Sequence, residues 1–339
     1  MFNEQGVNVA IVGATGAVGE ALIEILEQRK FPVAELFLLA SERSAGRRLQ
    51  FCGKSVMIQE LEKFDFSQAQ IGLFSAGGDV SAVYAPKAAA AGCVVIDNTS
   101  CFRYDDDIPL VVPEVNGHCV NDYVNRNIIA NPNCSTIQMV VALKPIYDAV
   151  GIRRINVCTY QAVSGAGTGG IKELAGQTAE LLNGKPITSK VMPTQIAFNA
   201  IPQIDKFQDN GYTKEEMKMV WETRKIFADE AIQVNPTCVR IPVFYGHSEA
   251  VHIETRDQIS AAEVTELLDA SAGVTVFADD AYPTPVEHGA GTDPVMVGRI
   301  REDISHPNGI NLWVVADNVR KGAALNSVQI AENLLNIMV

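Results

Sequence analysis

Hydrophobic residues in the first part of the chain alternate between short apolar runs and segments with helical spacing. Residues 7–12 form an apolar run that ends at a glycine, and residues 17–30 carry apolar side chains at positions 18, 22, 25 and 26. A buried run followed by a helical period is typical of a parallel strand and its crossover helix. Further strands are expected at residues 35–40, 55–59, 70–74, 93–97 and 128–130. This alternation predicts an α/β fold with an N-terminal, Rossmann-like, doubly wound parallel sheet.

The pattern changes beyond residue 133. Longer alternating stretches at residues 155–163, 250–255, 295–301 and 310–316 predict an open sheet that is mixed or antiparallel. Helices are expected at residues 215–227 and after Ser260, where Ser260 and Glu263 form a capping box. We therefore predict that the C-terminal part is an α+β domain with a mixed sheet.

The length of the chain indicates two domains. Its 339 residues exceed the roughly 250–300 residues at which a single core stops growing. We expect a first domain over residues 1–132 and a second over residues 133–319. The apolar positions of the last segment predict a helix, and we expect residues 320–339 to pack back on the first domain.

The composition is that of a globular protein that does not bind nucleic acid. Hydrophobic residues make up 47% of the chain and charged residues 20%. No apolar run approaches the roughly 18–20 residues that span a bilayer, and the first residues lack the pattern of a signal peptide. The formal net charge of −13 disfavours a surface that follows phosphates. We expect a cytoplasmic protein without membrane or nucleic-acid partners, in which any anionic substrate needs local Arg and Lys.

The cysteines indicate neither a disulfide framework nor a metal site. They stand at positions 52, 93, 101, 119, 134, 158 and 238, without C-x-x-C pairs or the spacing of metal ligands. We expect no bound metal, and we interpret six of the seven as small structural side chains. The exception is Cys134.

A glycine-rich segment, GATGAVG at residues 13–19, stands where the first strand is expected to pass into a helix. Glycines allow a tight turn and a close approach to a pyrophosphate, and the helix N-terminus supplies free N–H groups. The spacing differs from the commoner G-x-G-x-x-G, and glycine turns also occur for structural reasons. Because the strand–turn–helix context fits, we predict a dinucleotide site. Its candidate contacts are Gly13, Thr15, Gly16, Ala17 and Val18.

The residues after the second strand indicate which dinucleotide binds. NAD-specific sites usually place a carboxylate there for the ribose 2′-hydroxyl. Here Ser41, Arg43 and Ser44 offer hydroxyl and guanidinium groups that suit a 2′-phosphate, so we predict NADP(H). Glu42 argues in the opposite direction, and a solvated basic loop is the alternative interpretation.

Cys134 lies in the polar segment NPNCST, between an expected strand and a helix expected at residues 137–150. A helix N-terminus stabilises a thiolate, which is the reactive form, so we predict a nucleophile. The segment RIPVFYGH at residues 240–247 adds an arginine and a histidine that follows a glycine. Acyl chemistry through a thiol needs a proton carrier and groups that hold the substrate, and we assign these roles to His247 and Arg240. We interpret the other four histidines as structural.

Several blocks of the chain resemble, in the right order, those of the aspartate-β-semialdehyde dehydrogenase family over essentially the whole length. The blocks are VGATGAVGE, CFRYDDDIPLVVPEVN, NPNCST, QAVSGAG, EEMKMVWETRKI and RIPVFYGHSE. The resemblance implies an NADP-binding first domain, a catalytic and dimerisation second domain, and a homodimer. It also implies the reversible reductive dephosphorylation of L-aspartyl-4-phosphate to L-aspartate-4-semialdehyde through a thioester. This reaction would belong to the biosynthesis of lysine, threonine, methionine and diaminopimelate.

The resemblance further implies a role for individual residues. Cys134 matches the nucleophile, His247 the acid/base, and Gln161 the residue that orients the substrate. Arg240 matches the group that binds the substrate carboxylate, and Glu215 the residue that faces the substrate amino group. The implied phosphate site comprises Arg103, Asn133 and Lys218, and the further cofactor contacts are Ala76, Ser164, Gly165 and Asn318. From their spacing alone, Glu215 and Lys218 would be a surface ion pair.

Two alternatives remain open. An enzyme like N-acetyl-glutamyl-phosphate reductase has the same build and differs in the group beyond the acyl carbon; Glu215 and Arg240 favour the aspartyl substrate over it. A non-catalytic NADP-sensing module that binds a partner protein would require an unreactive Cys134.

Overall fold

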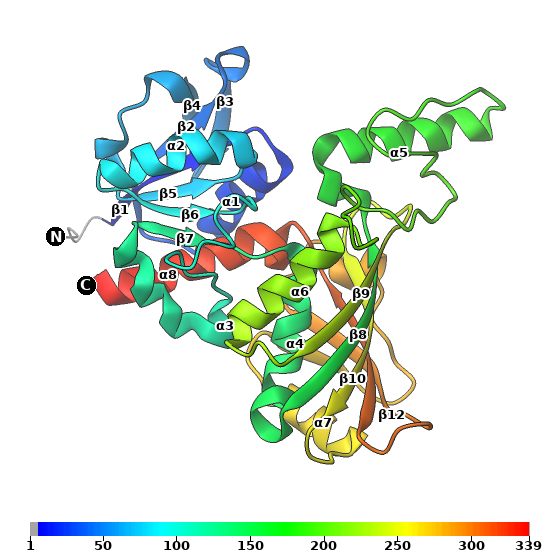
Figure 1. Ribbon diagram of the computed structural model, residues 1–339. Helices are drawn as coiled ribbons and strands as arrows, with labels where there is room; N and C mark the ends of the chain where they lie inside the picture. Colours follow the sequence, from blue (N-terminus) through cyan, green and yellow to red (C-terminus); the bar gives the residue numbers. More distant parts are fainter. Residues whose placement is uncertain (1–5, 339) are drawn as a thin grey trace. The chain divides into compact units, whose positions relative to one another are not determined.

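The computed structural model describes residues 6–338, which divide into two compact units (Figure 1). The first unit contains the described residues up to Asn133 together with those from Ala323 onward, and the second is Cys134–Gly322. The outermost limits of the predicted domains, residues 1 and 339, lie outside the described residues.

The first unit is built on a doubly wound sheet. Its strands are β1 (Val7–Val12), β2 (Val33–Ala40), β3 (Arg48–Phe51), β4 (Lys54–Glu60), β5 (Ile71–Phe74), β6 (Val94–Asp97) and β7 (Ile128–Ala130). They lie in the order β3-β4-β2-β1-β5-β6-β7, and every neighbouring pair is parallel except β3 with β4. The carboxyl ends of β1, β2 and β5 therefore meet at one edge, beside the point where the strand order reverses.

Helices cover both faces of this sheet. They are α1 (Ala17–Gln28), α2 (Gly78–Ala90), α3 (Pro113–Asn116) and α8 (Leu325–Met338). On one face, α1 and α8 pack together, and their buried residues join Val9, Ile11 and Leu38 in the core. On the other face, α2 packs against β5, β6 and β7. Because strand side chains alternate between faces, these strands need apolar residues at nearly every position, which explains their continuous apolar runs.

The second unit is built on a mixed sheet. Its strands are β8 (Ile152–Gln161), β9 (Gln233–Arg240), β10 (His247–Thr255), β11 (Val274–Phe277), β12 (Val295–Glu302) and β13 (Gly309–Ala316). The order is β11-β12-β13-β10-β8-β9, with parallel pairs β8/β9 and β11/β12 at its two ends and antiparallel pairs between them. This confirms the predicted fold class of a parallel N-terminal sheet followed by a mixed one.

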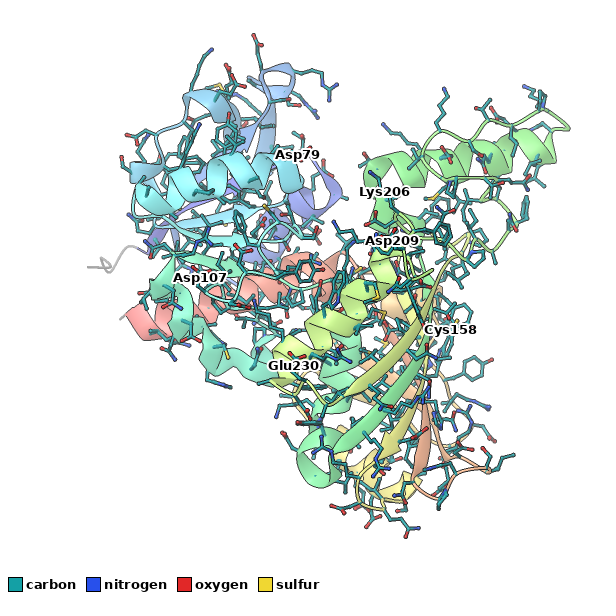
Figure 2. The ribbon with its side chains drawn as sticks, viewed as in Figure 1. Asp79, Asp107, Cys158, Lys206, Asp209 and Glu230 are labelled. Atoms are coloured by element: carbon teal, nitrogen blue, oxygen red, sulfur yellow. The ribbon has the colours of Figure 1, made fainter. Side chains whose placement is uncertain are left out.

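Helices cover only one face of the mixed sheet. The helices are α4 (Cys134–Val150), α5 (Gly167–Leu182), α6 (Lys214–Phe227) and α7 (Ala261–Asp269). Of these, α4 packs on β10, β13 and β8, α6 packs on β9, and α7 packs on β12 (Figure 1). Figure 2 shows Cys158 on the opposite side of β8, away from α6. There Tyr160 and Trp313 stand next to each other, with ring centroids 5.7 Å apart. No α-helix of the second unit packs on this face, where only the short turn Pro285–Gly289 contacts β13 and β10.

Three elements of the second unit were not predicted, namely β9, β11 and α5. Pro236 interrupts the apolar pattern of β9, and a proline inside a run argues against a central strand; β9 is an edge strand, where proline is tolerated. The helix α5 begins with three glycines among its first four residues, which are poor helix formers. Among residues 6–338, no helix is long and apolar enough to span a membrane.

Candidate active site

The glycine turn of the first unit joins β1 to α1 as predicted. Gly13 has a φ of +92°, and a Cβ at this position would lie 2.9 Å from the backbone nitrogen of Ala76. A side chain at Gly19 would collide with the Gly13 carbonyl oxygen. The N-cap residue of α1 is Gly16, which has no side chain that could accept a hydrogen bond from the first N–H groups of the helix. A ligand can therefore bind these N–H groups. This backbone cradle, which a Cβ would fill, fits a pyrophosphate.

The other predicted cofactor residues of the first unit lie at the same edge of its sheet. Ser41 follows β2 and precedes a short 3₁₀ turn that contains Arg43 and Ser44. Ala76 follows β5 and is exposed. All of them stand just beyond the carboxyl ends of neighbouring parallel strands, where doubly wound sheets bind dinucleotides. The hydroxyl and guanidinium groups beyond β2 fit a 2′-phosphate.

Arg103 is held by the loop that follows β6 in the first unit. Its Nη2 donates to the Asn98 carbonyl oxygen at 2.8 Å, and the residue is only 6% exposed. Asp97 anchors the same loop, because its carboxylate accepts hydrogen bonds from the hydroxyls of Ser81 and Thr99, each at 2.7 Å. A buried guanidinium on a fixed loop can serve an anionic ligand. Asn133, also predicted for the phosphate, is buried at the end of the same unit.

Cys134 is the first residue of α4 and is half-buried. A Cβ on Gly322 would lie 2.8 Å from the Cβ of Cys134, so the chain passes very close to the cysteine there. The position matches the predicted helix N-terminus, where the backbone N–H groups and the helix dipole favour a thiolate. The sulfur also acts electrostatically on Arg240, whose pKa it raises.

Gln161, Glu215 and Lys218 form one hydrogen-bonded chain in the second unit. The Gln161 amide donates to the Ser135 hydroxyl at 2.7 Å and to the Glu215 carboxylate at 3.3 Å. Lys218 donates to the same carboxylate at 2.8 Å and to Asp205 at 3.1 Å. Glu215 is only 5% exposed, so this is no surface ion pair. The chain joins the end of β8 to α6 and to the residue that follows Cys134.

Arg240, the last residue of β9, is buried beside this chain. Its Nη1 donates to the Ala162 carbonyl oxygen at 2.7 Å. Burial lowers the pKa of the guanidinium, while Glu215 and Cys134 oppose the shift, so the group stays charged. Gly165 makes room for it, since a Cβ there would lie 2.8 Å from Nη1. The positive charge of Arg240 is therefore fixed near both the Cys134 thiol and the Glu215 carboxylate, where it can bind an anionic group of a substrate.

His247, the first residue of β10, is fully buried and uncharged. Its Nδ1 accepts a hydrogen bond from the Ala162 N–H at 3.1 Å. Burial, assisted by the charge of Arg240, lowers the pKa of the imidazole to about 3. Because Nδ1 accepts, the hydrogen of the neutral ring is on Nε2, which has no partner among the described residues. The ring can thus donate a hydrogen bond from Nε2 to a reacting oxygen.

Ser164 and Asn318, both predicted as cofactor contacts, contact each other. The Asn318 amide and the Ser164 hydroxyl lie 2.9 Å apart, and Asn318 Oδ1 accepts the Gly246 N–H at 3.0 Å. Asn318 therefore fixes the residue before His247. Sequence reasoning missed Ser135 and the peptide groups of Ala162. Ser135 stands in a motif but was given no role, and nothing in the sequence marks Ala162.

Comparison with known proteins defines the class of protein. Residues 8–123 match the family model described as the semialdehyde dehydrogenase NAD binding domain, and residues 143–321 match the corresponding dimerisation domain. The fold and both domain matches are those of a semialdehyde dehydrogenase.

Comparison with individual relatives identifies the family within this class. The chain is 67% identical over 331 residues to aspartate-semialdehyde dehydrogenase 2 of Vibrio cholerae, covering 98% of each chain. A crystal structure of the Vibrio cholerae enzyme II complexed with ASA has a TM-score of 0.98 and 67% identity, covering 98% of this chain and 99% of that one. The Candida albicans enzyme, crystallised with NADP, has a TM-score of 0.74 and 26% identity, covering 97% and 98%. The chain belongs to the aspartate-semialdehyde dehydrogenase family. It is therefore an oxidoreductase of amino-acid biosynthesis with an NAD(P)-binding domain.

Proposed function

We propose that this protein catalyses the reversible, NADP-dependent reductive dephosphorylation of L-aspartyl-4-phosphate to L-aspartate-4-semialdehyde. The observation that carries the proposal is the position of Cys134 at the start of the buried helix α4. There the sulfur lies near enough to Arg240 to raise the pKa of its guanidinium group. The reaction would support the biosynthesis of lysine, threonine, methionine and diaminopimelate. None of the seven cysteines, which all lie among the described residues, forms a disulfide, and this is consistent with the reducing cytoplasm as the location of the protein.

In the biosynthetic direction, the Cys134 thiolate attacks the acyl carbon of the substrate, and the C–O bond to phosphate breaks. The products of this step are a Cys134 thioester and free phosphate. Bound NADPH supplies a hydride to the thioester carbon. The resulting oxyanion accepts a hydrogen bond from His247 Nε2, and the proton it takes up leaves again when the C–S bond breaks to release the aldehyde. We therefore assign Cys134 as nucleophile and His247 as the proton-handling residue.

Two side chains of opposite charge match the two charged groups on the α-carbon of the substrate. Arg240 binds the α-carboxylate, and Glu215 faces the α-amino group. Gln161 orients the substrate, because its amide is fixed by Ser135 and Glu215. The leaving phosphate is assigned to Arg103, Asn133 and Lys218. The complex of the Vibrio cholerae relative with ASA supports this choice of substrate.

The two units divide these tasks. Residues 1–132, with 320–339, hold NADP(H), and residues 133–319 carry catalysis and dimerisation. The cofactor contacts in the first unit are Gly13, Thr15, Gly16, Ala17, Val18, Ser41, Arg43, Ser44 and Ala76, and those in the second are Ser164, Gly165 and Asn318. The dimerisation-domain match and the sheet face on which no α-helix packs support a homodimer.

A steady-state assay tests the proposal. Purified protein is mixed with L-aspartate-4-semialdehyde, phosphate and NADP, and the formation of NADPH is followed by the absorbance of the reduced nicotinamide. We expect turnover that requires phosphate, is sustained by arsenate, and is faster with NADP than with NAD. Faster turnover of N-acetyl-glutamate semialdehyde would instead indicate the related reductase. No turnover, together with slow alkylation of Cys134 by iodoacetamide, would indicate a non-catalytic module.

A further inference from the structure

A second row of buried polar residues lies directly behind the site residues of the mixed sheet. Gln161 pairs with Arg240 across β8 and β9, and two residues back along each strand the pair is Thr159 with Cys238. On the other side of β8, Thr159 pairs with Glu249. Because side chains two residues apart share a face, Glu249, Thr159 and Cys238 lie on the same side as the site residues.

The helices that cover this face add polar groups to the second row. Gln138 lies one turn after Cys134 on α4, so the two side chains share a face of the helix. Thr223 lies on the buried side of α6. Both residues are 0% exposed, and so are Glu249, Thr159 and Cys238. The next five residues of α4, Met139–Leu143, are apolar and buried, which makes a polar group here costly unless it is hydrogen-bonded.

The second row has polar atoms without direct partners. Among the described residues, no hydrogen bond reaches either carboxyl oxygen of Glu249, either amide atom of Gln138, or the hydroxyls of Thr159 and Thr223. Gln138 is nevertheless placed for a side-chain hydrogen-bonding interaction with Glu249, which lowers the pKa of the carboxyl group against the larger opposing effect of burial. Buried polar atoms in native proteins are almost always satisfied by protein or by ordered water, and a buried water typically makes about three hydrogen bonds. Several adjacent unpartnered atoms therefore indicate bridging water.

We propose that Glu249 on β10 and Gln138 on α4, with Thr159, form a buried polar layer that ordered water completes behind the active site, and that Glu249 acts through this layer as a positioning residue for Cys134 and His247. The positioning part rests on the proposed function. Glu249 lies two residues from His247 on β10, and Gln138 lies four residues from Cys134 on α4. Apolar packing holds α4 on the sheet, and a hydrogen-bonded bridge between α4 and β10 adds a directional constraint. The layer therefore sets the position of the sulfur relative to the imidazole.

The carboxyl group of Glu249 is protonated in this layer. Complete burial without a neighbouring cation raises the pKa of Glu249 well above its usual value. A protonated carboxyl can both donate and accept, as an amide can. Glu249→Gln should therefore preserve the layer, whereas Glu249→Met, of similar length but apolar, should abolish it. Ile253→Met is the matched control, because Ile253 is fully buried on the same strand and the same face.

Three measurements test the proposal on these variants. A high-resolution crystal structure of the wild type should show ordered water bound to the carboxyl group of Glu249. In the steady-state assay, Glu249→Met should lower kcat by about tenfold to a hundredfold with little change in KM, since displacement of a reacting group by about 1 Å costs on the order of a hundredfold. Glu249→Gln and Ile253→Met should stay within about threefold of the wild type. The alkylation of Cys134 by iodoacetamide should change in Glu249→Met alone.

Several outcomes would overturn the proposal. One is the absence of ordered water at the carboxyl group of Glu249, and another is an equal loss of kcat in Glu249→Gln and Glu249→Met. Wild-type rates in Glu249→Met would also contradict it. If Glu249→Met does not fold, Gln138→Met takes its place with the same expectations. Should the wild type itself lack the proposed activity, the crystal structure and the alkylation rates still decide whether the layer exists.

Discussion

Gly165 offers a direct test of how closely the site is packed. A Cβ at this position would lie 2.8 Å from Nη1 of Arg240 and 3.5 Å from Cε1 and Nε2 of His247. Protein Cβ atoms essentially never approach other heavy atoms within 3.0 Å, so in Gly165→Ala the guanidinium has to move. Its hydrogen bond to the Ala162 carbonyl oxygen, 2.7 Å long, would then be lost or distorted. The substitution should therefore disturb Arg240 without removing any charged group.

The expected size of the effect follows from that hydrogen bond. A hydrogen bond from a charged group contributes about 1.5–3 kcal/mol, and about 1.4 kcal/mol corresponds to a factor of ten in rate. We expect kcat/KM for L-aspartate-4-semialdehyde to fall by about ten- to a hundredfold in Gly165→Ala, mainly through a higher KM, because Arg240 is assigned to the substrate carboxylate. The assay follows NADPH formation over a range of semialdehyde concentrations, and thermal unfolding checks the fold.

Gly176→Ala is the matched control for this experiment. Gly176 is an exposed residue of α5, and a Cβ there would meet nothing within 4 Å. Alanine is favoured over glycine in a helix by about 1 kcal/mol, so this variant should be slightly more stable and fully active. A Gly165→Ala variant with the kcat/KM of the wild type would refute the packing argument.

Three further predictions concern other parts of the molecule. Gly19→Ala should weaken NADP binding and lower the thermal stability, because the new Cβ would collide with the Gly13 carbonyl oxygen; a fluorescence titration with unchanged affinity would contradict this. Thr213→Ala removes one half of the capping box that Thr213 and Glu216 form on α6, so the free energy of unfolding should fall by about 1 kcal/mol in a denaturant titration, and no loss would contradict the cap. His247 has a pKa lowered from 6.5 to about 3, so it should give no inflection in kcat/KM between pH 5 and 8. Because the unfolded chain takes up a proton that the folded imidazole does not, the free energy of unfolding should fall as pH drops from 6.5 toward 3, and His247→Gln should show a smaller fall.

Much of the fold could be predicted from local patterns in the sequence. The strands β1, β5 and β6 are continuous apolar runs because both of their faces are covered, and the glycine turn stands between β1 and α1 as the sequence predicts. The capping box of Ser260 and Glu263 at the start of α7 is also confirmed. In contrast, β9 carries an internal proline and α5 starts with glycines, so their local signals contradict the structure that tertiary contacts impose.

In the site, too, some features follow from local sequence and others depend on tertiary contacts. Cys134 could be predicted from one local motif, because a helix N-terminus and its preceding loop are contiguous in sequence. The strand register that sets Gln161 beside Arg240, and Glu249 beside Thr159, joins segments about 80 to 90 residues apart and leaves no local trace. The assignments of individual residues to substrate, phosphate and cofactor therefore stay predictions.

Detection of the covalent intermediate on Cys134 tests the central claim most directly. The enzyme is mixed with L-aspartate-4-semialdehyde and excess NADP in the absence of phosphate, and the NADPH formed in the first turnover is measured together with the intact mass of the protein. We predict a burst of NADPH stoichiometric with the enzyme and an acyl adduct that maps to the peptide containing Cys134, both absent from Cys134→Ala. An equal burst in Cys134→Ala, or an adduct on another residue, would contradict the account.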